Sequence, residues 1–453
     1  MDIKKTFEKY IDIFEKNFSN VKQHESSSLY KIRTEAYEKF KKHGMPDHND
    51  ENYKYAGISE ICSQDYEFSL DSRGAIVDLN EYFQCEIKDL DTHIALLSNG
   101  EYYSNNKPIE NIGEGVIICG LNMAINKYPE IIKEYYNQNA REYDDSFSEL
   151  NTMFAKDGLF IYVPENTKID KTIQLVNLIH GFGNKNIFKR NLIIVRKNSE
   201  LSLVICDHTL NNSNNFVIDV TESVVLENAK FCYHNLQKEP NKTGVINSHF
   251  VKLNKYSKFD SYILSFHGGI IRNNLFVKMI GEFAESNLFG LNLTDREQRI
   301  DNYTLIEHDV PNCSSNELYK GILDEQAKGS FMGRIIVKPN AQKTLAYQTN
   351  RNICLTPEAK MRTKPQLEIY ADDVKCSHGA TVGQLDETAL FYLKQRGINE
   401  KEAKLMLMFA FANDILLKIN IVPLRERIAE LIDSRLRGEF SACEHCLMNC
   451  NSR

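Results

Sequence analysis

Hydrophobic and polar positions follow two different periods along the chain, and the change of period predicts its organisation. In residues 1–153, apolar side chains recur at spacings of three and four residues, which is typical of amphipathic helices. One such face carries Tyr30, Arg33, Ala36, Tyr37 and Phe40. Gly44 and Pro46 follow, and they predict the end of this helix because glycine accepts the left-handed cap conformation and proline cannot continue the hydrogen-bond ladder. We therefore expect a mainly helical N-terminal region.

From residue 154 to residue 385 the pattern changes to short runs of β-branched and aromatic residues between polar turns, with no helical period among them. Four units of strand, short turn and strand begin at Leu192, Phe216, His249 and Leu275, at offsets of 24, 33 and 26 residues. A loose repeat of this length favours a β-solenoid, whose coils bury their apolar sides against one another. A large antiparallel sandwich gives similar strand spacing, so periodicity alone leaves both architectures open.

Helical patterns return in residues 386–438. Asp386 is a predicted N-cap, and Asn399 with Glu402 three residues later forms a capping pair for the next helix. That helix is apolar on nearly all sides, and it includes Leu405, Met408, Phe409, Phe411 and Ala412. Such a helix is either buried on several sides or packs on its own domain with one face and on another protein with the other. A last helix from Pro423 precedes a tail of residues 439–453.

Composition narrows the classes of protein. The chain has 453 residues, of which 42% are hydrophobic and 26% charged, and this is the composition of a globular protein. The net charge of −7 argues against nucleic-acid binding, which usually needs a basic excess. The N-terminus lacks the apolar stretch of a signal peptide, and the longest wholly apolar run, residues 405–412, is far shorter than the roughly 20 residues of a membrane span. We expect a cytoplasmic protein whose 11 cysteines, an odd number, are free thiols.

Candidate chemistry rests on cysteine and histidine, because the sequence contains no Walker-type glycine loop, G-x-S-x-G elbow or H-E-x-x-H helix. Cys376 and His378 lie two residues apart, so on a strand they share one face. Thiolate and imidazole suit iron, zinc or copper(I), but two ligands do not complete a site. Either the pair is a buried cysteine with a hydrogen-bonded histidine, or a partner chain supplies further ligands.

The tail carries a second cluster, formed by Cys443, His445, Cys446 and Cys450. The spacing partly matches cysteine runs that hold iron–sulfur clusters, although a fourth cysteine is missing. Transient metal binding and a flexible tail with exposed thiols are the two interpretations. We expect the strand cysteines to be small core residues and the strand histidines to be hydrogen-bonded structural residues: Cys206, Cys232, Cys313, Cys354, His208, His234, His267 and His308.

Four consecutive segments, at 308–323, 333–355, 363–387 and 390–403, resemble the SufB/SufD family of the SUF iron–sulfur cluster assembly machinery, and its SufD branch in particular. The most specific match is DDVKCSHGATVG followed closely by FYLKQRGI. Weaker agreement covers residues 154–175 and 33–58, where Tyr53 and Ala56 replace a tryptophan and a threonine that are usual in the family. Gly379 stands where SufB-type sequences carry a glutamate beside the histidine, and this favours the SufD branch.

The resemblance implies a mainly β fold, a right-handed parallel β-helix (β-solenoid) core at 154–385 between N- and C-terminal helical regions. It also implies a non-enzymatic scaffold that pairs with a SufB-like paralogue and binds a SufC-like ATPase through the C-terminal helices. His378, with Cys376 as its companion, then matches the residue implicated in building a transient iron–sulfur cluster, or holding iron, at an interface shared with SufB. The apolar helix, with Leu405, Met408, Phe409, Phe411 and Ala412, is the expected docking element for SufC.

The resemblance further implies reduced FAD in the complex. A homodimer of the isolated chain is the alternative to pairing with SufB. Two functions from other classes compete with the scaffold: a β-helix enzyme acting on carbohydrate, for which no suitably spaced acid pair is visible, and an autonomous metal-binding protein using Cys443, Cys446 and Cys450.

Overall fold

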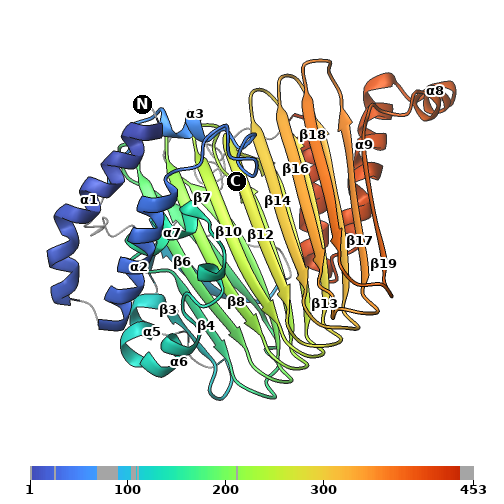
Figure 1. The fold of residues 1–453 in the computed structure, drawn as a ribbon. Coiled ribbons are helices and arrows are strands. Elements are labelled where there is room, and N and C mark those ends of the chain that lie inside the picture. Colours follow the sequence, from blue (N-terminus) through green and yellow to red (C-terminus); the bar gives the residue numbers. More distant parts are fainter. Residues whose placement is uncertain are drawn as a thin grey trace.

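The computed structural model describes residues 3–24, 27–68, 90–103, 109, 112–210 and 213–438, and their centre is a β-solenoid (Figure 1). The chain passes from one sheet to the other and back, so each coil adds one strand to each sheet, and strands β4–β19 make eight coils. Neighbouring coils pair in parallel and in register. The β-solenoid predicted from the sequence is confirmed, and the sandwich is not.

Two sheets, named here sheet I and sheet II, face each other across the interior. Sheet I consists of ten strands: β2 (Glu101–Tyr102), β1 (Thr92–Ser98), β5 (Thr172–Ile179), β7 (Glu200–Thr209), β9 (Lys230–Lys238), β11 (Lys258–His267), β13 (Glu285–Thr294), β15 (Ser314–Leu323), β17 (Leu345–Cys354) and β19 (Lys375–Gly383). Sheet II consists of nine: β3 (Ile117–Gly120), β4 (Leu159–Val163), β6 (Asn186–Val195), β8 (Phe216–Val225), β10 (Gly244–Leu253), β12 (Ile270–Met279), β14 (Arg299–His308), β16 (Lys328–Val337) and β18 (Lys360–Ile369).

The coil length is more regular than the sequence pattern indicates. Successive strands of sheet I from β5 to β19 begin 27 to 31 residues apart. The offsets of 24 to 33 arise because three of the four recognised units start inside a strand, at Leu192 in β6, at His249 in β10 and at Leu275 in β12. The turns repeat as well: Asn198 and Asn228 both have positive φ, and each donates a side-chain hydrogen bond to the asparagine one coil earlier, at 2.7 and 2.9 Å.

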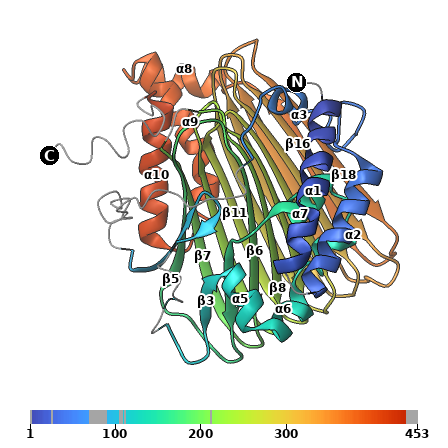
Figure 2. The same ribbon diagram turned by 90° about the vertical axis from the view of Figure 1, so that its left-hand side faces the viewer.

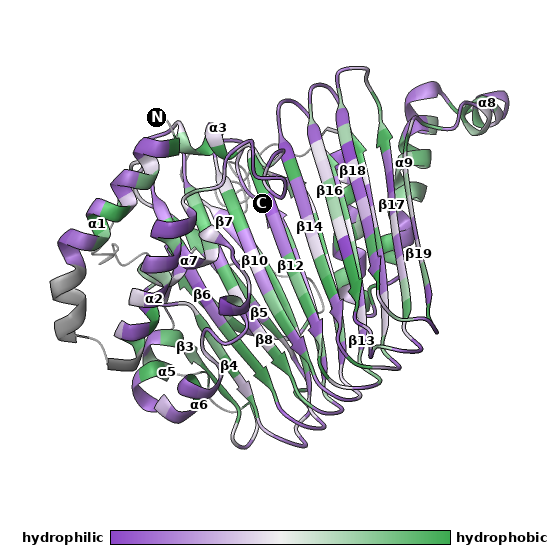
Figure 3. Cartoon of the chain, in the orientation of Figure 1, coloured by the Kyte–Doolittle hydropathy of each residue, from purple (hydrophilic) through white to green (hydrophobic). Residues whose placement is uncertain are grey.

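Apolar side chains fill the space between the sheets, as alternation along a strand requires. Leu203, Phe231, Ile263, Leu275 and Ile335 belong to this buried core. Figure 3 shows hydrophobic residues along the strands and hydrophilic residues at the turns of the lower rim.

The N-terminal helices cover the outer face of sheet II (Figures 1 and 2). They are α1 (Ile3–His24), α2 (Ser27–His43), α3 (Ile58–Cys62), α5 (Leu121–Lys127), α6 (Pro129–Tyr135), the 3₁₀ turn η1 (Ala140–Glu142) and α7 (Ser146–Phe154). Phe40 and Phe147 pack with Phe216 and Ile218 of β8. The same region supplies β1 and β3, which pair with β5 and β4, so the two sheets take strands from both sides of residue 154.

The C-terminal helices α9 (Glu400–Leu416) and α10 (Val422–Leu436) lie on the outer face of sheet I, whereas α8 (Glu387–Gln395) projects past β19 (Figure 1). The Asp386 side chain accepts hydrogen bonds from the first turn of α8, and Asn399 accepts one from Glu402 N, so both predicted caps are confirmed. Lys320 Nζ of β15 donates to Asp414 at 2.5 Å and fixes α9 to the sheet. Among the described residues, no helix is both long and apolar enough to cross a membrane.

Candidate functional site

The last coil leaves an open end on the solenoid. Strands β18 and β19 terminate sheets II and I, and in the described chain each pairs with one neighbour, β16 or β17. Eight of the nine residues of β19 are exposed, and β18 is at most half-buried throughout. Exposed edges of this length present unpaired N–H and C=O groups to which another strand can pair.

The two edges differ in one respect. Lys375 N donates to Thr344 O, so alternate N–H groups of β19, among them that of Ala380, point away from β17. On β18, Lys360 N donates to Ala327 O, so Pro365 falls where an N–H group would point outward. Proline is tolerated on such an edge because it removes no bond to the neighbouring strand. The edge of β19 contains no proline and is uninterrupted.

Cys376 and His378 lie on β19 at this open end. Cys376 is in register with Ala346 and His378 with Gln348, two buried residues of β17, so both follow inward-facing positions of the solenoid. Cys376 is half-buried and packs against the main core, and burial raises the pKa of its thiol. His378 is exposed. The structure thus brings the predicted pair to one face, while its role in binding metal stays a prediction.

Two residues that sequence reasoning missed lie beneath His378. Gln348 is next in register, and its Nε2 donates to the carboxylate of Glu317 in β15. Glu317 is fully buried, and burial raises its pKa to about 7. Gly333 leaves the room for this contact, because a Cβ there would lie 2.2 Å from Gln348 Nε2. The sequence feature that could have indicated this site is Glu317, a charged residue at a strand position that alternation places inside the solenoid.

The ligand set at the open end is incomplete. Within the described residues, no third histidine, cysteine or carboxylate joins Cys376 and His378 to form a metal-binding group. Iron or zinc sites usually have four protein or substrate ligands. A cluster bound here therefore needs ligands from sulfide or from another chain.

Besides Cys376 and the buried Cys62 of α3, the cysteines lie either in or beside the described strands or outside the described residues. Those of the described strands are buried or half-buried, and burial raises the pKa of Cys206 and Cys232 to about 12, which keeps them as thiols. Cys206 and Cys313 are buried, as predicted, whereas Cys232 and Cys354 are half-buried. Cys443, Cys446 and Cys450 lie outside the described residues.

The four strand histidines, predicted to be hydrogen-bonded structural residues, are buried, and His208 Nε2 has no hydrogen-bond partner in the described structure. Burial lowers the pKa of His208, His234 and His308 to about 4. His267 and His308 make the expected hydrogen bonds, His267 Nδ1 to Glu239 O at 2.7 Å and His308 Nε2 to Ser315 Oγ at 2.9 Å.

The five apolar residues predicted to dock SufC face their own sheet to different degrees. Leu405, Met408 and Ala412 are buried against sheet I, and Phe409 and Phe411 are half-buried beside them, because α9 lies flat on the sheet. Their contact with a partner stays a prediction.

The exposed apolar side chains of the C-terminal region lie at other positions of α8 and α9. Phe391 and Tyr392 of α8 are 63% and 56% exposed, and Met406 of α9 is 49% exposed. No residue of α8 is buried and six of its nine residues are exposed, so most of this helix is open to contacts outside the described chain.

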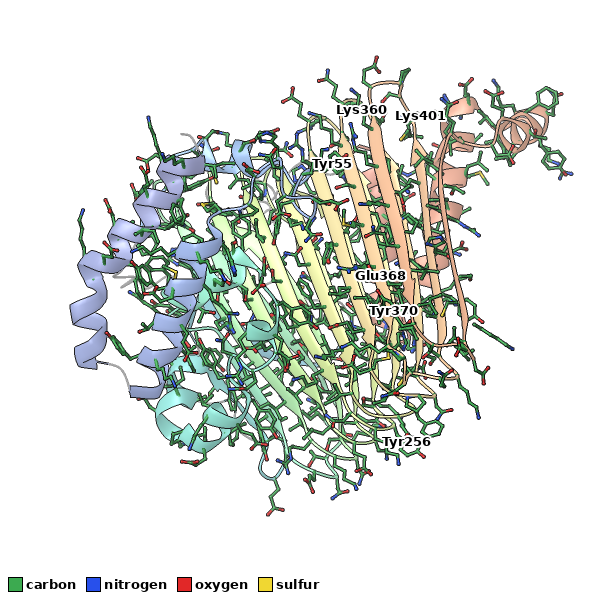
Figure 4. All side chains as sticks on the ribbon, in the orientation of Figure 1. Tyr55, Tyr256, Lys360, Glu368, Tyr370 and Lys401 are labelled. Carbon is green, nitrogen blue, oxygen red and sulfur yellow. The ribbon has the colours of Figure 1, made fainter. Side chains whose placement is uncertain are left out.

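Charged side chains lie along β18, where Figure 4 labels Lys360 and Glu368. The guanidinium of Arg362 lies 4.5 Å from the centre of the Tyr55 ring. Both line a pocket of about 360 Å³, and a second of about 430 Å³ lies beside α9. Both volumes are at the small end of the range for small-molecule sites.

Together these features define a β-solenoid protein with helical regions at both ends and an open final coil. Residues 178–411 match the model described as SUF system FeS cluster assembly, SufBD core domain, and residues 4–175 match the SufBD protein N-terminal region. The chain therefore belongs to the SufBD family, as its sequence motifs indicated.

Relatives cover much of its length. An iron–sulfur cluster assembly SufBD family protein of Synechocystis sp. is 28% identical, over 86% of this chain and 87% of its own. The iron–sulfur cluster assembly protein SufD of Escherichia coli is 29% identical, over 64% and 70%. A chloroplastic protein of Arabidopsis thaliana, ABCI7, is 31% identical, over 62% and 61%.

Proposed function

We propose that this chain is a SufD-type scaffold subunit that acts without enzymatic activity of its own in iron–sulfur cluster assembly. The observation that carries the proposal is an incomplete pair of soft ligands, Cys376 and His378, at the end of the solenoid where β19 and β18 finish the two sheets as long exposed edges. The scaffold would hold iron or a nascent cluster as its cargo. We also propose that the protein is located in the cytoplasm.

The proposed partner at the open end is a SufB-like paralogue. One of its strands extends sheet I by pairing with β19, and its side chains complete the coordination begun by Cys376 and His378. The uninterrupted edge of β19 supports this arrangement, since long unprotected edges are otherwise prone to aggregation. Pairing of two copies of this chain is the alternative occupant.

The proposed site for a SufC-like ATPase is the C-terminal helical region, residues 386–438. The exposed Phe391 and Tyr392 of α8 support it, because aromatic side chains are enriched where protein interfaces form. The five residues Leu405, Met408, Phe409, Phe411 and Ala412 contribute through the packing that holds α9 on sheet I.

Co-purification with SufB-like and SufC-like partners tests the pairing. Ala380→Pro removes an N–H group that points to the open edge and spares the ladder to β17, so the variant should keep its far-UV circular dichroism and lose the SufB-like partner. Ala380→Ser keeps the N–H group and is the matched control. Undiminished SufB capture by Ala380→Pro would exclude pairing through β19.

A further inference from the structure

A second group of metal-ligating side chains lies far from the open end, where the end of α2 meets the start of α7. His43 is the last residue of α2, Asp144 precedes the N-cap of α7, and Glu149 lies in the first turns of α7. One ligand atom from each can be chosen so that all lie within 4.8 Å of one another, and His43 Nδ1 is 3.1 Å from Glu149 Oε1. Figures 1 and 2 both show α2 and α7 side by side.

Glu149 provides an observation that is independent of this clustering. Its side chain is 6% exposed, and its Oε2 is buried without a hydrogen-bond partner in the described structure. The residue lines a pocket of about 110 Å³ together with Lys39 and Thr152. A buried carboxylate oxygen without a partner is unfavourable, so a native protein normally supplies a donor or a cation for it.

Charged groups of both signs surround Glu149, since Glu35, Lys39 and Arg141 line the same pocket. Asp145 is already satisfied, since it accepts hydrogen bonds from Tyr53, Ser248 and Ser148 N. Asp144 faces Lys39 at 3.7 Å, and Lys39 also donates to the carbonyl of Arg141. An ion pair of protonated His43 with Glu149 is the simplest alternative, because the C-terminus of α2 favours a cation. That ion pair gives Glu149 Oε1 a partner but leaves Glu149 Oε2 without one.

We propose that His43, Asp144 and Glu149 bind one divalent first-row metal ion of the Mn²⁺, Fe²⁺ or Zn²⁺ class. One imidazole and two carboxylates form a donor set of nitrogen and oxygen that suits these ions, unlike the thiolate-containing pair at the open end. Ligand distances of about 2.0–2.2 Å require the three groups to close by roughly 1–2 Å, and Asp144, 75% exposed on a loop, can make that movement. Water completes the coordination at the exposed side, and the ion links α2 to α7 over sheet II.

Titration of the full chain with Mn²⁺, followed by electron paramagnetic resonance of the free ion, tests the proposal. Manganese is the appropriate probe because it prefers nitrogen and oxygen donors and discriminates against the cysteines elsewhere in the chain. The expected result is one bound Mn²⁺ per chain, at least tenfold weaker binding in Glu149→Gln and His43→Ala, and unchanged binding in His48→Ala, which removes an exposed histidine five residues away.

Asp144→Asn provides a variant that does not threaten folding, because its side chain is exposed, and it should also weaken Mn²⁺ binding at least tenfold. Bound Mn²⁺ should broaden the NMR signals of α2 and α7 before those of the strands β17 and β19. No bound Mn²⁺ in the wild-type chain, or binding that all three variants retain, would overturn the proposal.

Discussion

A fully buried ion pair joins the N-terminal helices to the solenoid, and its removal gives the sharpest stability prediction. Arg190 of β6 and Glu222 of β8 are both 0% exposed, with 2.6 Å between Nη2 and Oε2. Glu222 also accepts hydrogen bonds from the backbone N–H groups of Asn137, Asn139 and Ala140, in the segment that runs from the end of α6 into the first residue of η1. The Glu222 carboxylate therefore binds the Arg190 cation and also three backbone N–H donors from a segment 82 to 85 residues earlier in the chain.

Glu222→Gln preserves the shape of this side chain and removes its charge, so the buried Arg190 cation loses its ion-pair partner. Breaking a buried pair from one side destabilises by about 3–5 kcal/mol, against a total stability of about 5–15 kcal/mol for a typical domain. Arg190→Met should have a comparable effect. The double variant should lose less than the sum of the two, because no uncompensated charge remains.

Urea unfolding followed by far-UV circular dichroism measures these differences. Glu227→Gln is the matched control, since its pair with Lys197 is a surface pair at 3.0 Å, about half exposed, and should contribute less than about 1 kcal/mol. If Glu222→Gln were as mild as Glu227→Gln, the buried pair would not hold the helices to sheet II as argued.

Three further predictions concern other parts of the molecule. Burial raises the pKa of Glu317 from 4.5 to about 7, so the folded state binds a proton that the unfolded state releases, and the stability that this proton confers is lost as the pH rises from about 4.5 through 7. In Glu317→Gln, the fall in the free energy of unfolding over this pH range should be smaller by roughly 3 kcal/mol, measured by urea unfolding at each pH. Parallel pH profiles of the variant and the wild type would refute this prediction. Gly290→Ala places a Cβ 2.1 Å from the Tyr319 ring and should destabilise by about 1–3 kcal/mol, measured by urea unfolding; an unchanged midpoint would show that the ring moves freely. Phe391→Ser with Tyr392→Ser should leave stability within about 0.5 kcal/mol and weaken capture of a SufC-like ATPase at least tenfold, whereas intact capture would move that site off α8.

Local signals in the sequence predicted local structure well. The caps at Asp386 and Asn399 were predictable because a capping side chain binds backbone within its own turn. The shared face of Cys376 and His378 follows from the two-residue period of a strand. The repeat of strand and turn favoured the solenoid but left the sandwich open, because both architectures space their strands similarly, and the family motifs decided between them.

Features that depend on distant contacts were not predictable. Glu222 lies in a strand as a buried carboxylate, and nothing near it in the sequence indicates partners at residues 137–140. The apolar α9 gave no sign of which side would meet sheet I, so Leu405 and Met406 were equivalent until the sheet was placed beside them. Glu149 and His43 are similarly separated by 106 residues.

The central claim is that a cluster is assembled at the open end with Cys376 and His378 as this chain's share of the ligands. The most direct test is the iron and acid-labile sulfide content of the anaerobically purified complex with SufB-like and SufC-like partners. With Cys376→Ala and His378→Ala combined, the complex should assemble and carry much less iron and sulfide, whereas Ser377→Ala, between them on the same strand, should match the wild type. Equal iron and sulfide in the double variant and the wild type would contradict the assigned site.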